Sequence, residues 1–225
     1  MLHDQEKNVG CNSKVISMKF KTSQEEFWVG SFGDEYIDRN QSSQLIASNI
    51  SLFSNVIRRS SGIQSIIEFG SNIGLNLVAL NQLLPHVELS AVEINEKAIN
   101  ILRQWDKVKK IYHQSILDFE TDYLRDFVFT KGVLIHINPD VLPIVYDKMY
   151  ETCQKYICIA EYYNPVAQEI NYRGQTEKLF KRDFAGDLLD RFNDLTLIDY
   201  GFVYHRDTNF SLDDISWFLL EKDKK

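Results

Sequence analysis

The sequence predicts an α/β fold built around a mostly parallel sheet, and three observations support this. Short apolar runs alternate with helical patterns of roughly 10–15 residues from residue 64 onward, as in β-α-β units. A turn that contains two glycines follows the first of these runs. After residue 192 the alternation stops, and two apolar runs are separated by too few residues for a helical crossover. The chain is therefore expected to end in an antiparallel hairpin at the sheet edge.

Five apolar runs are expected to form the parallel strands, at residues 64–69, 87–93, 110–113, 126–134 and 155–161. Apolar residues recur at helical spacing over residues 41–57, 75–84, 98–105, 140–153 and 182–192. Asn95 is placed to cap the third of these helices, Pro139 to open the fourth, and Asp183 to cap the last. The two hairpin strands are expected at 195–204 and 214–220.

The whole chain has the size and charge of one globular domain that binds neither nucleic acid nor membranes. It contains 225 residues with a net charge of −7 and a pI near 5.3, which argues against a broad nucleic-acid surface. No apolar run approaches the roughly 18–20 residues that span a bilayer, so we expect a cytoplasmic protein. Residues 1–57 are expected to form an N-terminal extension with a lid helix, of which 1–20 is a frayed lead-in, and residues 58–225 the main domain.

The cysteines and histidines give no sign of a metal site. Cys11, Cys153 and Cys158 lack the spacing of metal ligands, and the five histidines are scattered. We expect the thiols to be structural or incidental, in a reducing compartment. The sequence leaves the oligomeric state open.

The sharpest motif is the segment EFGSNIG at residues 68–74, between the first strand and the helix that follows it. Gly70 lets the chain turn sharply and lets a ligand approach the backbone, and Gly74 opens a helix whose free N–H groups favour a polar or anionic ligand. Asn72 stands where the dinucleotide fingerprint has its second glycine, which disfavours NAD. A turn of this kind can also serve tight packing alone.

This E-x-G-x-x-x-G segment resembles motif I of the class I S-adenosylmethionine-dependent methyltransferases. The resemblance implies a Rossmann-like fold with a mostly parallel seven-stranded sheet and a C-terminal antiparallel hairpin. It implies S-adenosyl-L-methionine as the cofactor and S-adenosyl-L-homocysteine as the product. It also implies that the methionine part of the cofactor is held by Glu68, Gly70 and Gly74, and Asn72 of the same turn is a further candidate for cofactor binding.

Further positions suit the nucleoside half of that cofactor. Glu93 ends the second strand, 19 residues after Gly74. A carboxylate at this place can accept hydrogen bonds from both ribose hydroxyls, and Ile94 would pack against the adenine. By the same resemblance the loop after the third strand borders the adenine, with Ser115 and Ile116 as the candidates.

Most of the chain beyond residue 26 resembles a narrower group, the methyltransferases associated with pseudaminic acid biosynthesis. The similar segments are FWVGSFGDEYIDRN (27–40), FTKGVLIHINPD (129–140), EYYNP (161–165), YRGQTEKLFKRDFAGDLL (172–189), DYGFVYHRD (199–207) and DDISWFLLEK (213–222). This resemblance implies N- or O-methylation of a small anionic acceptor derived from a sugar, such as a nonulosonic acid precursor.

Four residues ahead of the sheet are candidates for ligand contacts made by a lid. Trp28, Tyr36 and Arg39 are expected at the cofactor, and Asn40 at the acceptor. Arg39 can pair with a carboxylate in bidentate geometry, and Tyr36 can donate to one. Alternatively, the aromatic side chains only dock this segment on the domain.

The candidate catalytic residues follow the fourth and fifth strands, at the edge where open α/β sheets bind ligands. His136 suits a general base because its ordinary pKa lies near neutrality, and Tyr162 is the second candidate. Tyr163 and Asn164 are expected to contact the acceptor. Alternatively, the His136 imidazole is hydrogen-bonded within its own loop. Asn164 and Pro165 lack the second proline of the amino-group DNA methyltransferase motif, which excludes that class.

A local basic cluster contains Arg173, Lys178, Lys181 and Arg182. Arg173 and Arg182 are expected to bind a carboxylate or phosphate of the acceptor, and the alternative is a solvated surface. Three functions remain open: methylation of a sugar-derived acceptor, methylation of another small anion such as an amino acid or a phosphonate, and a non-catalytic module that serves a partner enzyme. Methyl transfer from a sulfonium needs no metal.

Overall fold

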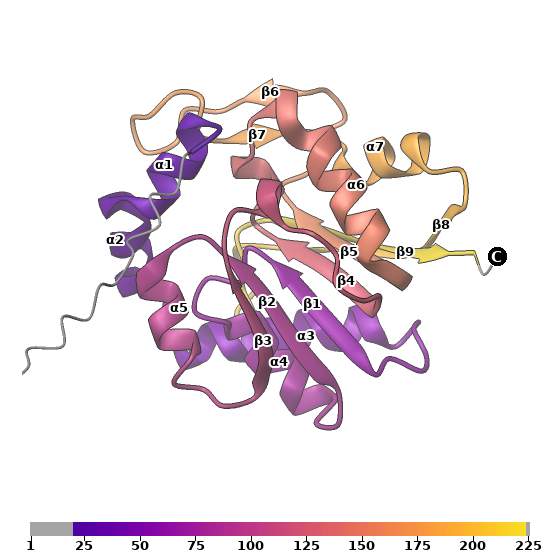
Figure 1. Ribbon diagram of the computed structural model, residues 1–225. Coiled ribbons are helices and arrows are strands. Elements are labelled where there is room, and N and C mark those ends of the chain that lie inside the picture. The colour runs from indigo at the N-terminus through magenta and orange to yellow at the C-terminus, as the bar shows by residue number, and fades with distance from the viewer. Residues whose placement is uncertain (1–19, 224–225) are drawn as a thin grey trace, which may run out of the picture.

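The computed structural model describes residues 20–223, and their central feature is one seven-stranded sheet (Figure 1). From one edge to the other, the strands are β3 (Val108–His113), β2 (Glu88–Glu93), β1 (Ser65–Phe69), β4 (Arg125–Lys131), β5 (Cys153–Glu161), β9 (Ile215–Lys222) and β8 (Leu195–Val203). The first five are parallel, and β9 lies antiparallel to both β5 and β8. The predicted α/β fold with a C-terminal antiparallel hairpin is confirmed.

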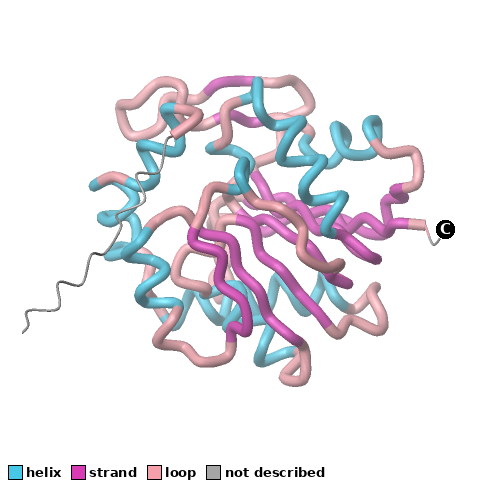
Figure 2. The backbone as a smooth tube through the Cα atoms, viewed as in Figure 1, coloured by secondary structure: helices cyan, strands magenta, loops and turns pink. Residues whose placement is uncertain are grey.

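Helices cover both faces of this sheet (Figure 2). They are α3 (Ser43–Ile57), α4 (Leu75–Leu83), α5 (Glu96–Leu102), α6 (Leu142–Thr152) and α7 (Phe184–Arg191), with short 3-10 turns η1 (Ile116–Asp118), η2 (Leu134–His136) and η3 (Pro139–Val141). Apolar side chains of α3 and α4 enter one buried cluster with Phe127 and Phe129 of β4. Those of α6 and α7 enter a second cluster on the opposite face with Val128. The sheet therefore separates two cores.

The predicted helix caps are formed. The Asn95 side chain accepts a hydrogen bond from the Ala98 amide at 2.9 Å, and Asp183 accepts one from the Gly186 amide at 2.8 Å. Gly74 caps α4 at a φ of +82°, where a Cβ atom would lie 2.5 Å from a methyl group of Leu102. A side chain at this position would therefore meet both backbone strain and a collision.

The structure differs from the sequence expectations in three places. Residues 20–40, called the N-terminal arm below, contain two short helices, α1 (Ser23–Val29) and α2 (Ser31–Arg39), in a stretch without a clean apolar period. The fourth strand ends at Lys131 rather than at residue 134, because Gly132 turns the chain at a φ of +65°. A two-stranded hairpin of β6 (Gln168–Glu169) and β7 (Phe180–Lys181) stands apart from the main sheet.

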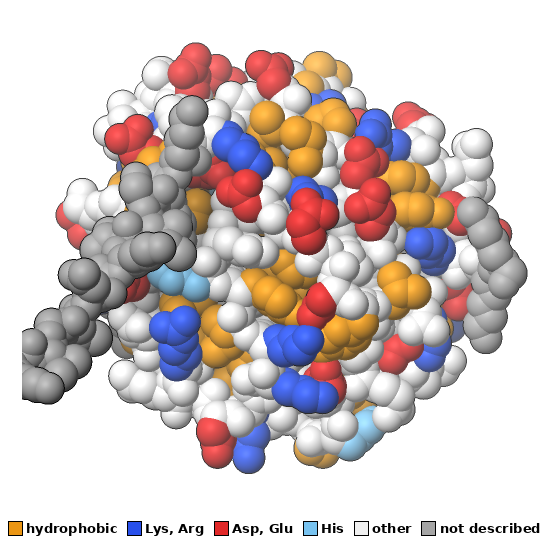
Figure 3. Space-filling model, viewed as in Figure 1, with side chains coloured by type: hydrophobic (Ala, Val, Ile, Leu, Met, Phe, Trp, Pro, Cys, Tyr) orange, Lys and Arg blue, Asp and Glu red, His pale blue; other side chains and the backbone are white. Residues whose placement is uncertain are grey.

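Neither the surface charges nor the cysteines indicate a functional site. Acidic and basic side chains are interspersed on the face shown in Figure 3. Within residues 20–223, no helix combines the length and the apolar character needed to cross a membrane. Cys153 and Cys158 are buried free thiols, and burial raises the pKa of each. Cys11 and the lead-in predicted for residues 1–19 lie outside the described residues.

One carboxyl group, that of Glu68, lies inside the sheet. The side chain is 0% exposed, and its Oε1 accepts a hydrogen bond from the Asn76 amide at 2.6 Å. Its second oxygen is buried and has no hydrogen-bond partner. Burial raises the pKa of Glu68 to about 8, against the opposing effects of Asn76 and Lys131. The group is therefore mostly protonated at neutral pH.

We predict that Glu68→Gln makes the protein more stable at alkaline pH. Between its ordinary pKa and about 8 the folded chain keeps a proton that the unfolded chain releases, so the wild-type free energy of unfolding falls as pH rises through this range. Glutamine mimics the protonated carboxyl without this dependence. Urea unfolding at about pH 5 and about pH 8 should show an advantage of the variant that grows with pH. The exposed Glu151→Gln is the control, and parallel pH profiles for wild type and Glu68→Gln would contradict the assignment.

Candidate functional site

A cavity of about 620 Å³ lies at the carboxyl ends of the parallel strands. Residues that follow each of the first five strands of the chain line it, namely Gly70, Ile94, Gln114, Gly132 and Tyr162. It opens where the strand order reverses between β1 and β4, the place where open α/β sheets bind ligands. The N-terminal arm, α3, the segment between β6 and β7, and the segment before β9 complete its walls.

The glycine turn after β1 forms the floor of this cavity. Gly70 has a φ of +78°, and a Cβ atom there would lie 2.7 Å from a methyl group of Val133. The amides of Gly70 and Ser71 both donate to the carbonyl oxygen of Val92, at 2.8 and 3.1 Å. These bonds hold the turn against the end of β2. Gly74 lies behind the cavity wall as the cap of α4, and Glu68 lies below it in the sheet.

The Glu93 carboxylate joins this turn to the start of α5. It is 8% exposed and accepts backbone hydrogen bonds from Asn72 at 2.7 Å, Ile94 at 2.8 Å and Asn95 at 2.7 Å. Burial raises the pKa of Glu93, and the three hydrogen bonds act against this rise. A carboxylate offers about four lone-pair sites, so one remains on Oε2 within the described residues. The geometry suits one ribose hydroxyl better than the two expected from the sequence.

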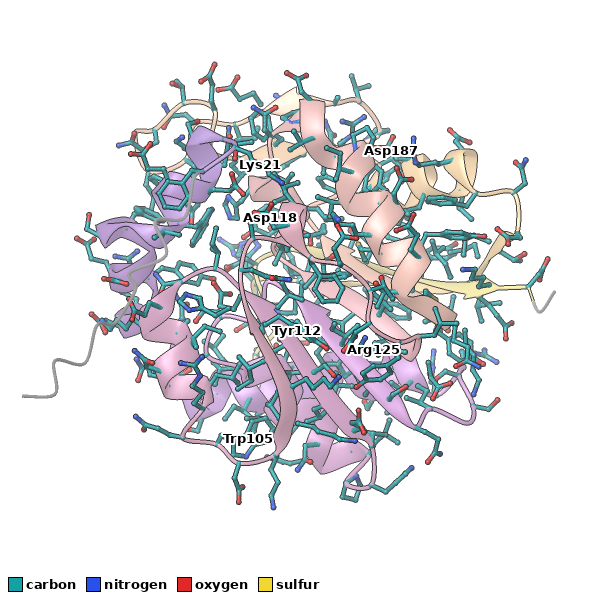
Figure 4. The ribbon with its side chains drawn as sticks, in the orientation of Figure 1. Lys21, Trp105, Tyr112, Asp118, Arg125 and Asp187 are labelled. Carbon is teal, nitrogen blue, oxygen red and sulfur yellow. The ribbon has the colours of Figure 1, made fainter. Side chains whose placement is uncertain are left out.

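The loop after β3 contacts the arm directly. The Ser115 hydroxyl donates to the carboxylate of Glu25 in α1 and accepts from the Leu117 amide at 3.0 Å. Ser115 therefore holds the arm, while the neighbouring Ile116 lines the cavity with Ile94. Figure 4 shows a second link nearby, between Lys21 of the arm and Asp118 of η1, whose ion pair spans 2.5 Å. Glu25 was not expected at the site.

A capping pattern in the sequence, Thr22 followed three residues later by Glu25, could have identified Glu25 as the start of a helix. Thr22 and Glu25 form a reciprocal capping box, in which the Thr22 hydroxyl accepts from the Glu25 amide at 3.2 Å and the Glu25 carboxylate accepts from the Thr22 amide at 2.8 Å. The same carboxylate then receives the Ser115 hydroxyl. One side chain thus starts α1 and attaches it to the wall of the cavity.

The arm also packs on α5 and on the loop after β4. The Asn95 side-chain nitrogen donates to the Trp28 carbonyl and to Asp34, both at 3.0 Å. A Cβ atom on Gly33 would lie 2.0 Å from that same carbonyl oxygen, so α2 approaches α1 more closely than any side chain permits. The indole of Trp28 contacts the rings of Tyr36 and His136, with centroids 5.3 and 4.7 Å apart.

Three of the four arm residues expected to contact a ligand line the cavity, and one does not. Trp28, Tyr36 and Asn40 line the cavity. Arg39 does not: its guanidinium lies 3.4 Å from Glu35 of the same helix and 5.7 Å from the centre of the Phe32 ring. The expected pairing of Arg39 with a ligand carboxylate therefore has no geometric support in this conformation.

His136 lines the cavity but has lost most of its basicity. Its Nδ1 lies 2.6 Å from the Lys178 carbonyl oxygen, and because a carbonyl only accepts, Nδ1 carries the proton. The ring is packed between Trp28 and Tyr172, and burial lowers the pKa of His136 to about 4. The imidazole is hydrogen-bonded, as the alternative predicted, but its partner lies 42 residues away between β6 and β7 and not in the loop that carries His136. The neutral ring presents Nε2 as an acceptor, which makes His136 a weak base at neutral pH.

The residues that follow β5 do not all face the cavity. Tyr162 lines the cavity, and burial raises the pKa of its phenol, so the hydroxyl stays protonated. Tyr163 is 42% exposed and packs on Phe218 of β9. The Asn164 side chain donates to the carbonyl of Val166 at 2.7 Å. Neither Tyr163 nor Asn164 reaches the cavity, so the structure does not support their expected contact with the acceptor.

The basic cluster is separated in space. Arg173 lines the cavity, where its φ of +51° places it in the left-handed region. Arg182 instead pairs with Asp187 of α7 at 2.8 Å. The Lys178 ammonium donates to the Ser23 hydroxyl of the arm at 3.0 Å, and that of Lys181 lies 5.1 Å from the centre of the Tyr162 ring. Of the two arginines expected at the acceptor, the structure brings only Arg173 to the cavity.

The cavity also contains polar residues that the sequence did not single out. They include Gln24, Asn49, Asn76, Lys131, Tyr172 and Asp213. Side-chain oxygens of Gln24, Asn49 and Asn76 are buried without a hydrogen-bond partner, which is rare in folded proteins unless a ligand or water fills the gap. Across residues 20–223, no three His, Cys, Asp or Glu side chains are grouped so that they could hold a metal ion.

A scan of the sequence against protein-family models gives no match, and neither does a search of curated protein sequences. Solved structures do match. The N-methyltransferase NodS from Bradyrhizobium japonicum is 14% identical, with a TM-score of 0.59 over 85% of this chain and 99% of that one. The 1,6-didemethyltoxoflavin N1-methyltransferase from Burkholderia thailandensis, solved with its namesake ligand and S-adenosylhomocysteine, is 12% identical, with a TM-score of 0.66 over 89% and 87%.

A third match is the magnesium protoporphyrin IX methyltransferase from Synechocystis with bound S-adenosylmethionine. It is 11% identical and gives a TM-score of 0.63 over 92% of this chain and 100% of that one. At such identities the likeness shows the fold alone. The chain has the Rossmann-like fold of the class I S-adenosylmethionine-dependent methyltransferases.

Proposed function

We propose that this protein is an S-adenosylmethionine-dependent methyltransferase that acts on a small acceptor. The observation that carries the proposal is the link from the glycine turn to Glu93 through the 2.7 Å hydrogen bond of the Asn72 amide. This link places a backbone that a ligand can approach closely beside a carboxylate with one unused acceptor site, in one cavity. The neighbours in fold that were solved with S-adenosylmethionine or S-adenosylhomocysteine support the same ligand class.

The polar groups of the cavity fit this cofactor. The buried oxygens of Gln24 and Asn76 have no partner, and an amino group supplies the donors that such oxygens require. In this assignment Gly70, Asn72 and Asn76 hold the methionine part, and Glu93 holds the ribose. Ile94 and Ile116 would pack on the adenine. The bound cofactor supplies a methyl group made electrophilic by a sulfonium.

The cavity has space and polarity for a second small molecule. Its volume of about 620 Å³ lies within the roughly 300–1,000 Å³ common for ligand sites. Tyr36, Tyr162 and Tyr172 line one region, with Arg173 from the segment between β6 and β7. Two of these tyrosines lie around the same pair of rings, since the Trp28 centroid is 5.3 Å from that of Tyr36 and the His136 centroid is 5.0 Å from that of Tyr172. The centroids of Trp28 and His136 are 4.7 Å apart. Burial against this wall excludes water from a displacement at carbon.

For the acceptor we propose a sugar-derived molecule with a carboxylate or phosphate, of the nonulosonic acid class. The resemblance to the pseudaminic acid-associated methyltransferases supports this choice, as does Arg173, which has no ion-pair or hydrogen-bond partner within residues 20–223. An arginine of this kind can bind an anion in bidentate geometry. The tyrosine hydroxyls suit the hydroxyl groups of a sugar.

We predict that the wild-type protein binds S-adenosylhomocysteine in isothermal calorimetry and that Glu93→Gln weakens binding at least about tenfold. The amide presents N–H groups where the carboxylate accepts hydrogen bonds, so the ribose and the Asn72 amide both lose an acceptor. Glu96→Gln, an exposed change at the start of the same helix, is the control. Thermal unfolding of each variant shows whether the fold survives. Absent wild-type binding, or unchanged affinity in a folded Glu93→Gln, would contradict the cofactor assignment.

A second prediction separates the two arginines. In an assay of S-adenosylhomocysteine formation with N-acetylneuraminic acid, its cytidine monophosphate conjugate and UDP-N-acetylglucosamine, Arg173→Gln should raise KM about tenfold or more with little change in kcat. Arg182→Gln should leave KM within about twofold, because Arg182 pairs with Asp187 away from the cavity. Serine and 2-aminoethylphosphonate test the other small anions. Turnover with those two and with none of the sugars would move the assignment to that class.

A further inference from the structure

Lys131 occupies an unusual position for a charged side chain. It is the last residue of β4, beside β1 at the point where the strand order reverses, and it lines the cavity. Within residues 20–223, its side-chain nitrogen makes no hydrogen bond and no ion pair. Lys131 is half-buried, and an ammonium partly removed from water without a partner carries a desolvation cost. A residue in this situation at the wall of a ligand cavity is a candidate for a functional role.

The charged groups that face Lys131 come from three elements, and each has its own partners or lies apart. Glu68 of β1 accepts from Asn76, and Glu161 of β5 accepts backbone hydrogen bonds from Val133 at 3.0 Å and Leu134 at 3.1 Å. Asp213 lies in the segment before β9, at the cavity wall. These three carboxyl groups raise the pKa of Lys131, but burial lowers it by more, so the net direction is down.

A neutral group that also lacks a partner lies in the same cavity. Asn49 of α3 is 3% exposed, and its side-chain oxygen is buried without a hydrogen bond. The β-strand register puts Lys131 on the face of the sheet that α3 covers, since Phe129 two residues earlier belongs to the cluster with Phe53 of that helix. Lys131 and Asn49 together offer a nitrogen and an oxygen that both need a ligand.

His136 and Tyr162, the two bases predicted from the sequence, are unsuited to accept a proton. The Nδ1 atom of His136 is bonded to a carbonyl, and its pKa of about 4 makes the ring a weak base. Tyr162 keeps its phenolic proton because burial raises its pKa. A neutral lysine amine is a strong base whose pKa responds readily to burial. Lys131 is therefore better suited than either of them to remove a proton from an acceptor.

We propose that Lys131 is the catalytic base, whose neutral amine takes the proton of the acceptor hydroxyl or amino group while the Asn49 oxygen orients that group. This inference rests on the proposed methyltransferase function. As the acceptor atom bonds to the transferred methyl carbon, the carbon–sulfur bond breaks and leaves its electron pair on sulfur. The acceptor proton passes to Nζ of Lys131, which becomes an ammonium and later releases the proton to water.

The first test measures the titration of Lys131 directly. The protein is labelled with trace acetic anhydride over a pH series, and peptide mass spectrometry follows acetylation of Lys131 against the exposed Lys107 in the same sample. We expect an apparent pKa for Lys131 below the ordinary lysine value of 10.5 and slower labelling when S-adenosylhomocysteine is present. An ordinary lysine titration would overturn the proposal. So would a complete lack of label, because it would show that small molecules do not reach the amine.

The second test compares Lys131→Met with Lys131→Arg. Methionine removes the unpartnered amine, so we expect an unchanged or higher Tm, S-adenosylhomocysteine affinity within about twofold, and a loss of at least about 100-fold in methyl transfer to N-acetylneuraminic acid or whichever tested acceptor turns over. Arginine stays protonated and cannot accept the proton, so it should also be inactive. An active Lys131→Arg, or a strongly destabilised Lys131→Met, would overturn the proposal. Failure of the wild type to bind S-adenosylhomocysteine would instead contradict the proposed function.

Discussion

The Glu93 carboxylate supports the site because three backbone amides depend on it. It binds the amide of Asn72 in the glycine turn and those of Ile94 and Asn95 at the start of α5. Hydrogen bonds to a charged group contribute about 1.5–3 kcal/mol each, and loss of the acceptor leaves buried donors unsatisfied. The loops after β1 and β2 are thereby held in one arrangement. The same carboxylate must serve both the fold and any ligand that reaches its remaining lone pair.

Local sequence patterns were enough to predict the parallel strands, the C-terminal hairpin and the helix caps. Alternating apolar runs separated by helical periods indicate parallel strands wherever they occur. Asn95 and Asp183 cap helices through bonds that span three residues. Gly70 and Gly74 adopt the positive φ values that the turn requires. For the two caps the residue and its partner lie within one turn of chain.

The polar partners of site residues could not be predicted in this way, since they lie far apart in the chain. Ser115 and Glu25 are separated by 90 positions, and the aromatic arm that carries Glu25 shows no clean period. Arg173 and Arg182 have the same chemistry and similar surroundings in the sequence, yet only Arg182 meets a carboxylate of α7. Lys131 gave no signal, because a lysine at a strand end is usually a solvated residue and its isolation is a property of the packed structure.

The oxygen and the nitrogen of the Asn95 side-chain amide bind different parts of the structure. Its oxygen caps α5 through the Ala98 amide, and its nitrogen holds the arm through the Trp28 carbonyl and Asp34. The oxygen contact belongs to the permanent scaffold, whereas the nitrogen contacts can be broken without disturbing the helix. A guest that enters or leaves through the arm must break these contacts, the polar bonds of Lys21, Ser115 and Lys178, and the ring contact between Trp28 and His136. All of them lie at the rim, so the exchange of that guest would depend on the rim contacts and not on unfolding of the two cores.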